Sequence, residues 1–107
     1  MYVKLCTYKK LLSRFDWDPG RARANLAKHG VSFELARRVW DDPLHVIVPD
    51  RVIDGEQRWH AIGVVGTVTL VVVVHTYPGG EEENLARIIG ARKATSHERR
   101  RYEAEAP

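Results

Sequence analysis

The sequence predicts an α+β fold in which N-terminal helices pack on a mostly antiparallel, four-stranded meander sheet, followed by a basic C-terminal helix. Three features of the chain support this prediction. Two helix signals come first, four segments rich in β-branched residues follow, and a capping motif then precedes a run of cations. The length of 107 residues is that of one domain with a single modest core.

A short strand at residues 15–17 and a helix are expected to open the domain. Asp18 and Pro19 favour a helix start, because aspartate accepts hydrogen bonds from free amides and proline fits the first turn. The helix is expected to end at His29, since Gly30 can take the left-handed conformation that closes helices.

A second helix, the sheet and the last helix follow in order. Ser32 is a helix cap, and the helix after it is expected to reach Trp40. The expected strands cover residues 44–49, 58–65, 68–76 and 85–92. Thr95 and Glu98 have the spacing of a capping box and open the C-terminal helix.

Residues 1–14 have no clear pattern, and we expect them to form either an extension or an extra strand. The single domain is expected to cover residues 15–107. The longest apolar stretch, residues 68–74, is far too short to cross a bilayer. A lone cysteine, Cys6, excludes an internal disulfide and suits a reducing compartment. We therefore expect a cytoplasmic protein that does not associate with a membrane.

The hairpin between the second and third strands predicts which polar side chains share a sheet face. If residues 66–67 form a two-residue turn, the two residues that flank it pair with each other. Arg58 then lies opposite His75. Because side chains alternate along a strand, Arg58, His60 and His75 would share one face. The other face would be purely apolar and would hold the helices.

A dense group of cations near the C-terminus indicates an anionic partner, and nucleic acid is the usual polyanion for a small soluble protein. One acid, Glu98, accompanies this group before residue 103. The group comprises Arg87, Arg92, Lys93, His97, Arg99, Arg100 and Arg101. The alternative is a solvated, charged helix end, with Arg58 and Arg87 held in structural ion pairs with Asp50, Asp54 or Glu81.

Arginine and histidine without a pair of carboxylates suit phosphodiester cleavage without a metal. RNA supplies its own nucleophile, the 2′-hydroxyl, so the protein must remove its proton, stabilise charge on the phosphate and protonate the leaving oxygen. Histidine transfers protons near neutral pH, and arginine binds phosphate oxygens in a two-bonded geometry. The five histidines show no metal-ligand spacing, and a single cysteine cannot build a structural zinc site. We therefore expect no metal and no cofactor.

The chain resembles the BrnT family of toxins between residues 15 and 103. Five blocks carry the resemblance: Phe15-Asp-Trp-Asp-Pro19, Ala24-Asn-Leu-Ala-Lys-His-Gly-Val-Ser-Phe33, Asp41-Asp-Pro43, Arg58-Trp-His-Ala-Ile-Gly63 and Arg87-Ile-Ile-Gly-Ala-Arg-Lys-Ala94. The resemblance implies a RelE-like fold and a metal-independent endoribonuclease that cleaves RNA and inhibits translation, as the toxin of a type II toxin–antitoxin pair. It also implies a BrnA-like ribbon-helix-helix antitoxin, which neutralises the toxin by forming a hetero-oligomer with it. Operator DNA would be bound only through this antitoxin.

The same resemblance suggests site residues. The family's basic positions fall on Lys28, His29, Arg58, Arg87 and Arg92. We expect the three arginines to bind the phosphate and the transition state. The proton-transfer group is expected to be either His29 or His75, and the RNA backbone is expected to contact Lys28, Lys93, Arg99 and Arg100. Gly90 stands where the family commonly has serine, so a hydroxyl is absent there.

Two other functions remain open at this level. One is a non-catalytic nucleic-acid-binding or co-repressor module that acts through its antitoxin partner, and the other is a protein-interaction domain. Strong, salt-sensitive RNA binding without cleavage would favour the binding module.

Overall fold

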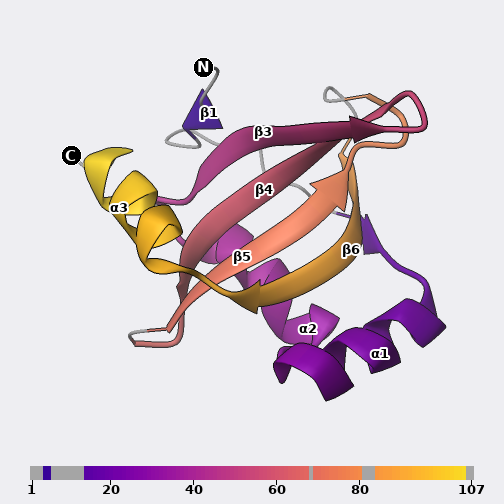
Figure 1. The fold of residues 1–107 in the computed structure, drawn as a ribbon, viewed down its shortest axis with the longest axis horizontal. Helices are drawn as coiled ribbons and strands as arrows, with labels where there is room; N and C mark the ends of the chain where they lie inside the picture. The colour runs from indigo at the N-terminus through magenta and orange to yellow at the C-terminus, as the bar shows by residue number, and fades with distance from the viewer. Residues whose placement is uncertain (1–3, 6–13, 68, 81–83, 106–107) are drawn as a thin grey trace.

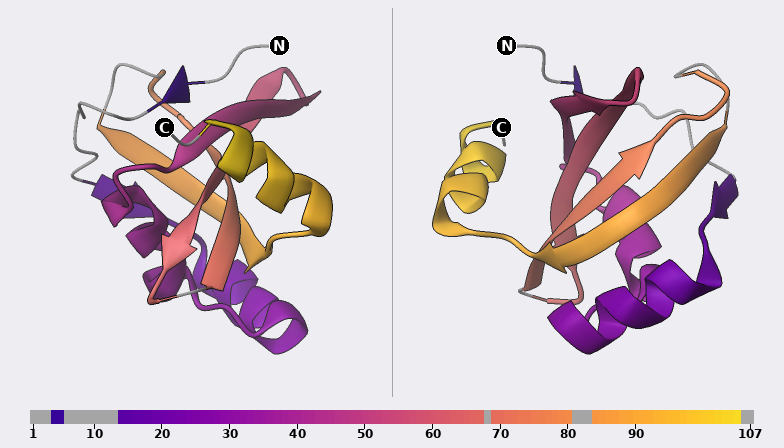
Figure 2. Two further views of the ribbon diagram at one scale, coloured as in Figure 1. Left: turned by 90° about the vertical axis from the view of Figure 1, so that its left-hand side faces the viewer. Right: turned by 45° about the vertical axis from the view of Figure 1, so that its right-hand side comes forward.

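A computed structural model describes residues 4–5, 14–67, 69–80 and 84–105. Its elements are β1 (Lys4–Leu5), β2 (Arg14–Asp16), α1 (Pro19–His29), α2 (Phe33–Ala36), the 3-10 helix η1 (Arg37–Asp41), β3 (Val46–Ile53), β4 (Glu56–Val65), β5 (Thr69–Thr76), β6 (Leu85–Lys93) and α3 (Ser96–Glu105). The N-terminal helices and α3 lie on opposite sides of one sheet (Figures 1 and 2). The predicted α+β class, with N-terminal helices on a mostly antiparallel sheet and a C-terminal helix, is confirmed.

The sheet has six strands in the order β1-β3-β4-β5-β6-β2. The predicted four-stranded meander is its centre, because β3 to β6 pair in succession and antiparallel. The two further strands lie at its edges: β1 pairs antiparallel with β3, and β2 pairs parallel with β6. Part of the N-terminal segment is thus a strand, while residues 1–3 and 6–13 lie outside the described residues.

Local signals set the ends of the first two helices. The Asp18 carboxylate accepts a hydrogen bond from the Arg21 amide at 2.8 Å, and Gly30 closes α1 with a φ of 72°. The Ser32 hydroxyl accepts from the Leu35 amide at 3.0 Å and starts α2. The second helix is α-helical only as far as Ala36 and continues as the tighter η1, a common ending for short helices.

The hairpin between β4 and β5 differs from the predicted register by one residue. Val65 pairs with Thr69, so Trp59 rather than Arg58 lies opposite His75. The connection therefore covers residues 66–68, of which Val68 lies outside the described residues. Three-residue hairpin loops are also common, and a slip of one residue moves every side chain to the other face. The prediction that Arg58 and His75 share a face is therefore wrong.

The sheet buries a core on each face. The face covered by α2 and η1 carries the larger one, which includes Phe33, Val39, Trp40, Trp59, Ala61, Val71, Val73 and Ile88. His75 belongs to this face and has no exposed surface. The opposite face carries a smaller core of Val46, Val48, Ile62, Leu70 and Val72, against which Tyr102 of α3 packs. The Tyr102 hydroxyl donates to Asp42 at 2.7 Å and so fixes α3 over this part of the sheet.

Helix α1 contains no buried residue and is held by the partly buried Ala22, which packs on the larger core, and by the polar side chain of Asn25. Asn25 donates to the carbonyl of Ala91 at 2.8 Å and to that of Val31 at 3.0 Å, and it accepts from the Ala91 amide at 3.2 Å. The pairing of β6 with β2 ends at Arg87. Beyond that point, the bonds from Asn25 satisfy backbone hydrogen-bonding groups of β6. They hold the C-terminal half of α1 beside β6. Within the described residues, no helix has the length and apolar character needed to span a membrane.

Candidate active site

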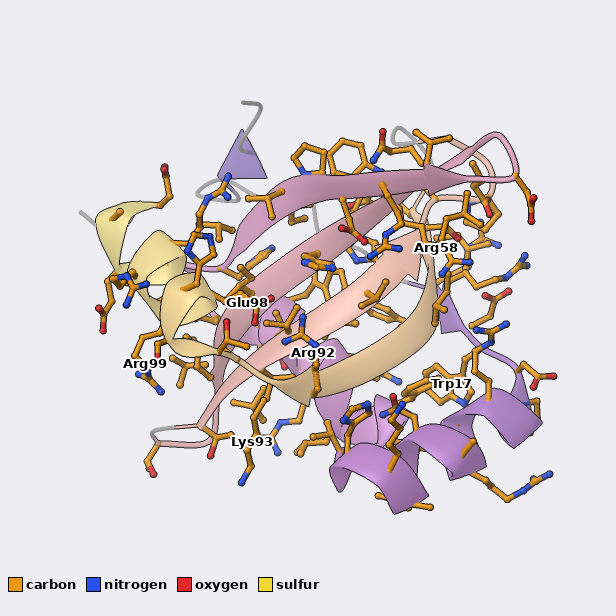
Figure 3. All side chains as sticks on the ribbon, in the orientation of Figure 1. Trp17, Arg58, Arg92, Lys93, Glu98 and Arg99 are labelled. Carbon is orange, nitrogen blue, oxygen red and sulfur yellow. The ribbon has the colours of Figure 1, made fainter. Side chains whose placement is uncertain are left out.

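The sheet face opposite α2 and η1 is only partly covered by α3. Arg58 and His60 of β4 point to this face, because they alternate with the buried Trp59 and Ala61 of the helix-covered face. Arg92 of β6 also belongs to it, as the register aligns Arg92 with Val72 and Ile62. Figure 3 shows Arg58 and Arg92 on this face, with Glu98 of α3 beside Arg92. We call the part bearing Arg58, His60 and Arg92 the open face.

Arg58 has no carboxylate partner in the described part of the chain, and Glu81, one of its predicted partners, lies outside the described residues. Among the described residues, no carboxylate lies within ion-pair distance of its guanidinium. Its Nε atom is buried and donates to no protein acceptor in the described part of the chain. A buried donor without a partner loses hydration without compensation, so an anionic ligand that accepts from it is favoured.

Arg92 is held by a carboxylate from α3. Its Nη1 and Nη2 atoms donate to the two carboxylate oxygens of Glu98 at 2.7 and 2.8 Å. Glu98 also accepts from the Thr95 amide at 2.9 Å, and its own amide donates to the Thr95 hydroxyl at 3.2 Å, which is the predicted capping box. The hydrogen bonds from Arg92 and the Thr95 backbone lower the pKa of Glu98 to about 2. The start of α3 and the orientation of Arg92 are therefore coupled through one side chain.

The Glu98 carboxylate should make stability depend on acid pH. Its pKa in the folded chain is lowered from 4.5 to about 2, so its stabilisation is complete above the unfolded pKa and is lost as the pH falls through the folded pKa. Solvent screens this partly exposed pair, so we expect a loss on the order of 2 kcal/mol between about pH 5 and pH 2. Urea unfolding across this range measures it. In Glu98→Gln the loss should be smaller by that amount, and an unchanged pH dependence would contradict the assignment.

His60 pairs with an acid from the neighbouring strand. Its Nε2 atom lies 3.4 Å from Oδ2 of Asp50, which lies where the β3–β4 register shifts, between Pro49 and Val52. Burial lowers the pKa of His60, and the charges of Asp50 and Glu98 partly oppose that shift. The sequence predicts that His60 and Arg58 share a face, because only Trp59 separates them on one strand. It contains no signal that Asp50 is the partner of His60.

Arg87 has an ion-pair partner. Its Nε and Nη2 atoms donate to the Asp16 carboxylate at 3.0 and 3.2 Å, across the parallel pair of β2 and β6. The pair is about half exposed, with side-chain exposures of 51% and 44%. The alternative of a structural ion pair therefore describes Arg87, although its partner is separated from it by 71 positions in the sequence.

The fold buries one of the two histidines predicted to transfer protons and exposes the other. His75 is enclosed between Trp40 and Tyr77, with ring centroids 4.9 Å from each. His29 is exposed at the end of α1, one turn beyond the Asn25 contact with β6.

The predicted backbone-binding cations lie around this face rather than on it. Lys93 follows Arg92 and points to the other side of the sheet, and Lys28 is exposed on α1. Arg99 and Arg100 are exposed on α3, and Figure 3 shows Arg99 directed away from the sheet. In the part of the chain that the structure describes, no three His, Cys, Asp or Glu side chains are placed to hold a metal ion.

Comparison with known proteins assigns the family. Residues 17–98 match the family model described as the ribonuclease toxin, BrnT, of type II toxin–antitoxin systems. The chain is similar in structure to the crystal structure of the Brucella abortus ribonuclease toxin BrnT, with a TM-score of 0.60 and 22% identity over 78% of this chain and 97% of that one. A search of the curated proteins gave no match. This chain, whose open sheet face carries Arg58, His60 and Arg92, belongs to the BrnT family of ribonuclease toxins of type II toxin–antitoxin systems.

Proposed function

We propose that the chain is a metal-independent endoribonuclease that binds RNA across the open face, cleaves it and thereby inhibits translation. The observation that carries the proposal is Arg58, a cation with no carboxylate partner among the described residues, on the same sheet face as Arg92 and His60. A fixed guanidinium that faces developing charge on a phosphate stabilises the transition state without reorganisation.

Arg58 and Arg92 have different roles in binding the phosphate. Arg58 is the primary ligand of the scissile phosphate, because no carboxylate of the described residues pairs with its guanidinium. Glu98 engages the Nη atoms of Arg92 and fixes its orientation, which leaves Nε to donate to a substrate oxygen. Arg87 of β6 and the exposed Arg99 and Arg100 of α3 bind the flanking RNA backbone.

An antitoxin of the BrnA-like ribbon-helix-helix class is the proposed partner, in a hetero-oligomer in the cytoplasm. Its toxin-binding segment covers the open face with acidic side chains that neutralise Arg58, and operator DNA is bound through the antitoxin. Covering one cationic surface would block RNA binding and cleavage together.

The test compares the native chain with Arg58→Ala on a defined RNA in EDTA, free and on ribosomes. We expect metal-independent cleavage by the native chain and a loss of about a hundredfold in Arg58→Ala, the usual effect of removing one charged donor. Arg58 makes no ion pair in the described structure, so the variant should unfold at nearly the native temperature. Arg38→Ala, an exposed arginine of η1, is the matched control and should cleave normally.

A non-catalytic RNA-binding module is the second candidate, and the internal pairing of Arg92 and Arg87 favours it. Two of the three arginines expected at the phosphate already form ion pairs within the chain, Arg92 with Glu98 and Arg87 with Asp16. Tight binding that weakens steeply with salt, without cleavage of free or ribosome-bound RNA, would establish this function in place of the nuclease.

A further inference from the structure

His60 is the one of the chain's five histidines that shares a sheet face with Arg58 and Arg92. His45 and His75 are buried, with exposures of 2% and 0%. The other two, His29 and His97, are exposed on α1 and α3. A proton-transfer group must lie within hydrogen-bond reach of the reacting atoms, so its position relative to the phosphate ligands decides between candidates.

We propose that His60 is the general base of the ribonuclease reaction and that Asp50 orients its imidazole. This inference rests on the proposed ribonuclease function and names the group that removes the 2′-hydroxyl proton. It replaces His75, which the observed register places on the other face.

The register places His60 between the two phosphate ligands. Arg58 precedes it by two residues on β4, so both side chains point to the same face. Across the sheet, His60 pairs with Val74 and Val74 pairs with Gly90, while Arg92 lies two residues beyond Gly90 on the same face. The residues paired in a line from His60 across to β6 are therefore only Val74 and Gly90, and Gly90 has no side chain. RNA lying across this line can contact both arginines and the imidazole.

Asp50 gives the imidazole the arrangement of a base. Nε2 lies 3.4 Å from the Asp50 carboxylate, which favours the tautomer with its proton on Nε2 and leaves Nδ1 as the ring nitrogen that accepts a proton. A carboxylate behind one ring nitrogen selects the tautomer and stabilises the imidazolium once the proton has been taken up. Asp50 is therefore a positioning residue, and His60 is the catalytic residue.

Burial keeps His60 neutral before the reaction, because it lowers the pKa of the imidazole more than the neighbouring acids raise it. Burial is the largest influence and lowers its pKa, as do the cations Arg92 of β6 and Arg51 of β3. Asp50 of β3 and Glu98 of α3 raise the pKa in part. Arg58 lies on the same face of β4, two residues before His60. A neutral imidazole at pH 7 can accept the 2′-hydroxyl proton.

The proposed step balances without an added reactant. Nδ1 of neutral His60 takes the proton from the 2′-hydroxyl, and the 2′-oxygen forms a bond to phosphorus as the bond from phosphorus to the 5′-oxygen breaks. The leaving oxygen keeps the bonding electron pair and takes a proton from water. The products are a 2′,3′-cyclic phosphate and a 5′-hydroxyl end, and the imidazolium returns its proton to solvent.

The experiment compares the native chain with His60→Gln, with Arg38→Ala on η1 as the control. We expect His60→Gln to lower kcat by at least about a hundredfold, the usual contribution of a general base, and to bind RNA within about threefold of the native chain. The Arg38→Ala variant should match the native chain in both assays. Circular dichroism and thermal unfolding confirm that each variant is folded.

The pH profile distinguishes a base from a structural histidine. The native rate should fall as the pH drops through the His60 titration, because the protonated ring cannot act as a base. Asp50→Asn removes a charge that raises this pKa, so its acidic limb should move to lower pH while its maximal rate falls. If His60 were not the titrating base, Asp50→Asn would leave the acidic limb unmoved.

Each outcome has one meaning. Cleavage by folded His60→Gln at more than a tenth of the native rate, or an unmoved acidic limb in Asp50→Asn, overturns the inference and leaves the ribonuclease proposal intact. If the native chain cleaves neither free nor ribosome-bound RNA, both the ribonuclease proposal and this inference are overturned. Loss of RNA binding in folded His60→Gln would make His60 a binding residue and overturn its role as base.

Discussion

Arg92→Ala should lose both cleavage and stability, and the two losses have different causes. We expect the rate to fall by about a hundredfold to a thousandfold, the effect of removing one charged donor to a transition state. We also expect a loss of about 2 kcal/mol of stability. The reason is that Glu98, 14% exposed, would keep its charge without the two hydrogen bonds that hold it, at 2.7 and 2.8 Å.

A second variant separates these causes. In Arg92→Gln/Glu98→Gln the unpaired charge is absent, so most of the lost stability should return while cleavage stays low. Urea unfolding and single-turnover cleavage measure the two quantities on the same preparations. If the double variant regains cleavage together with stability, Arg92 acts only by fixing α3, and its assignment to the phosphate is wrong.

Gly63→Ala should destabilise the chain by about 3 kcal/mol or more, because the site has no room for a methyl group. A Cβ at this position would lie 2.9 Å from Cγ1 of Val39, 3.0 Å from the Val39 carbonyl oxygen and 3.1 Å from Cβ of His45. Gly63 is thus the contact through which η1 packs on β4. Backbone at 3.0 Å cannot move aside as a flexible side-chain end can, so η1 must shift.

Gly90→Ala is the matched control for this substitution. A Cβ there would meet Oδ1 of Asn25 at 3.6 Å and Val74 at 4.0 Å, which are ordinary contacts. Alanine in a strand also loses less conformational entropy on folding than glycine, so we expect no loss and a gain of up to about 0.5 kcal/mol. Chemical unfolding of the two variants should therefore give changes of opposite sign. Equal losses would show that close packing at Gly63 is not the cause.

The sequence predicted the elements whose signals are local. Asp18 and Gly30 mark the ends of α1, and the Thr95 and Glu98 pair marks the start of α3, because each motif is completed within a few residues. The limits of the meander strands were predicted to within a few residues from their β-branched composition. The same information gave Arg58 and Arg92 as candidates, since both lie within strands.

The candidate site depended on contacts that no local signal carries. Arg87 pairs with Asp16 from the start of the domain, and His60 pairs with Asp50 across a strand irregularity. The sequence therefore could not tell which arginine was already neutralised.

The chain's sequence by itself determined the fold class, the order of the elements and the cations available to bind an anion. Only the tertiary structure decided which histidine stands beside Arg58 and which arginines retain a free charge. The physical reason is that one additional residue in the loop after Val65 reverses the face of every residue on β5, and this moves His75 into the core. Ion pairs form between strands only after that register is set, so the charge pattern of the site is a property of the assembled sheet.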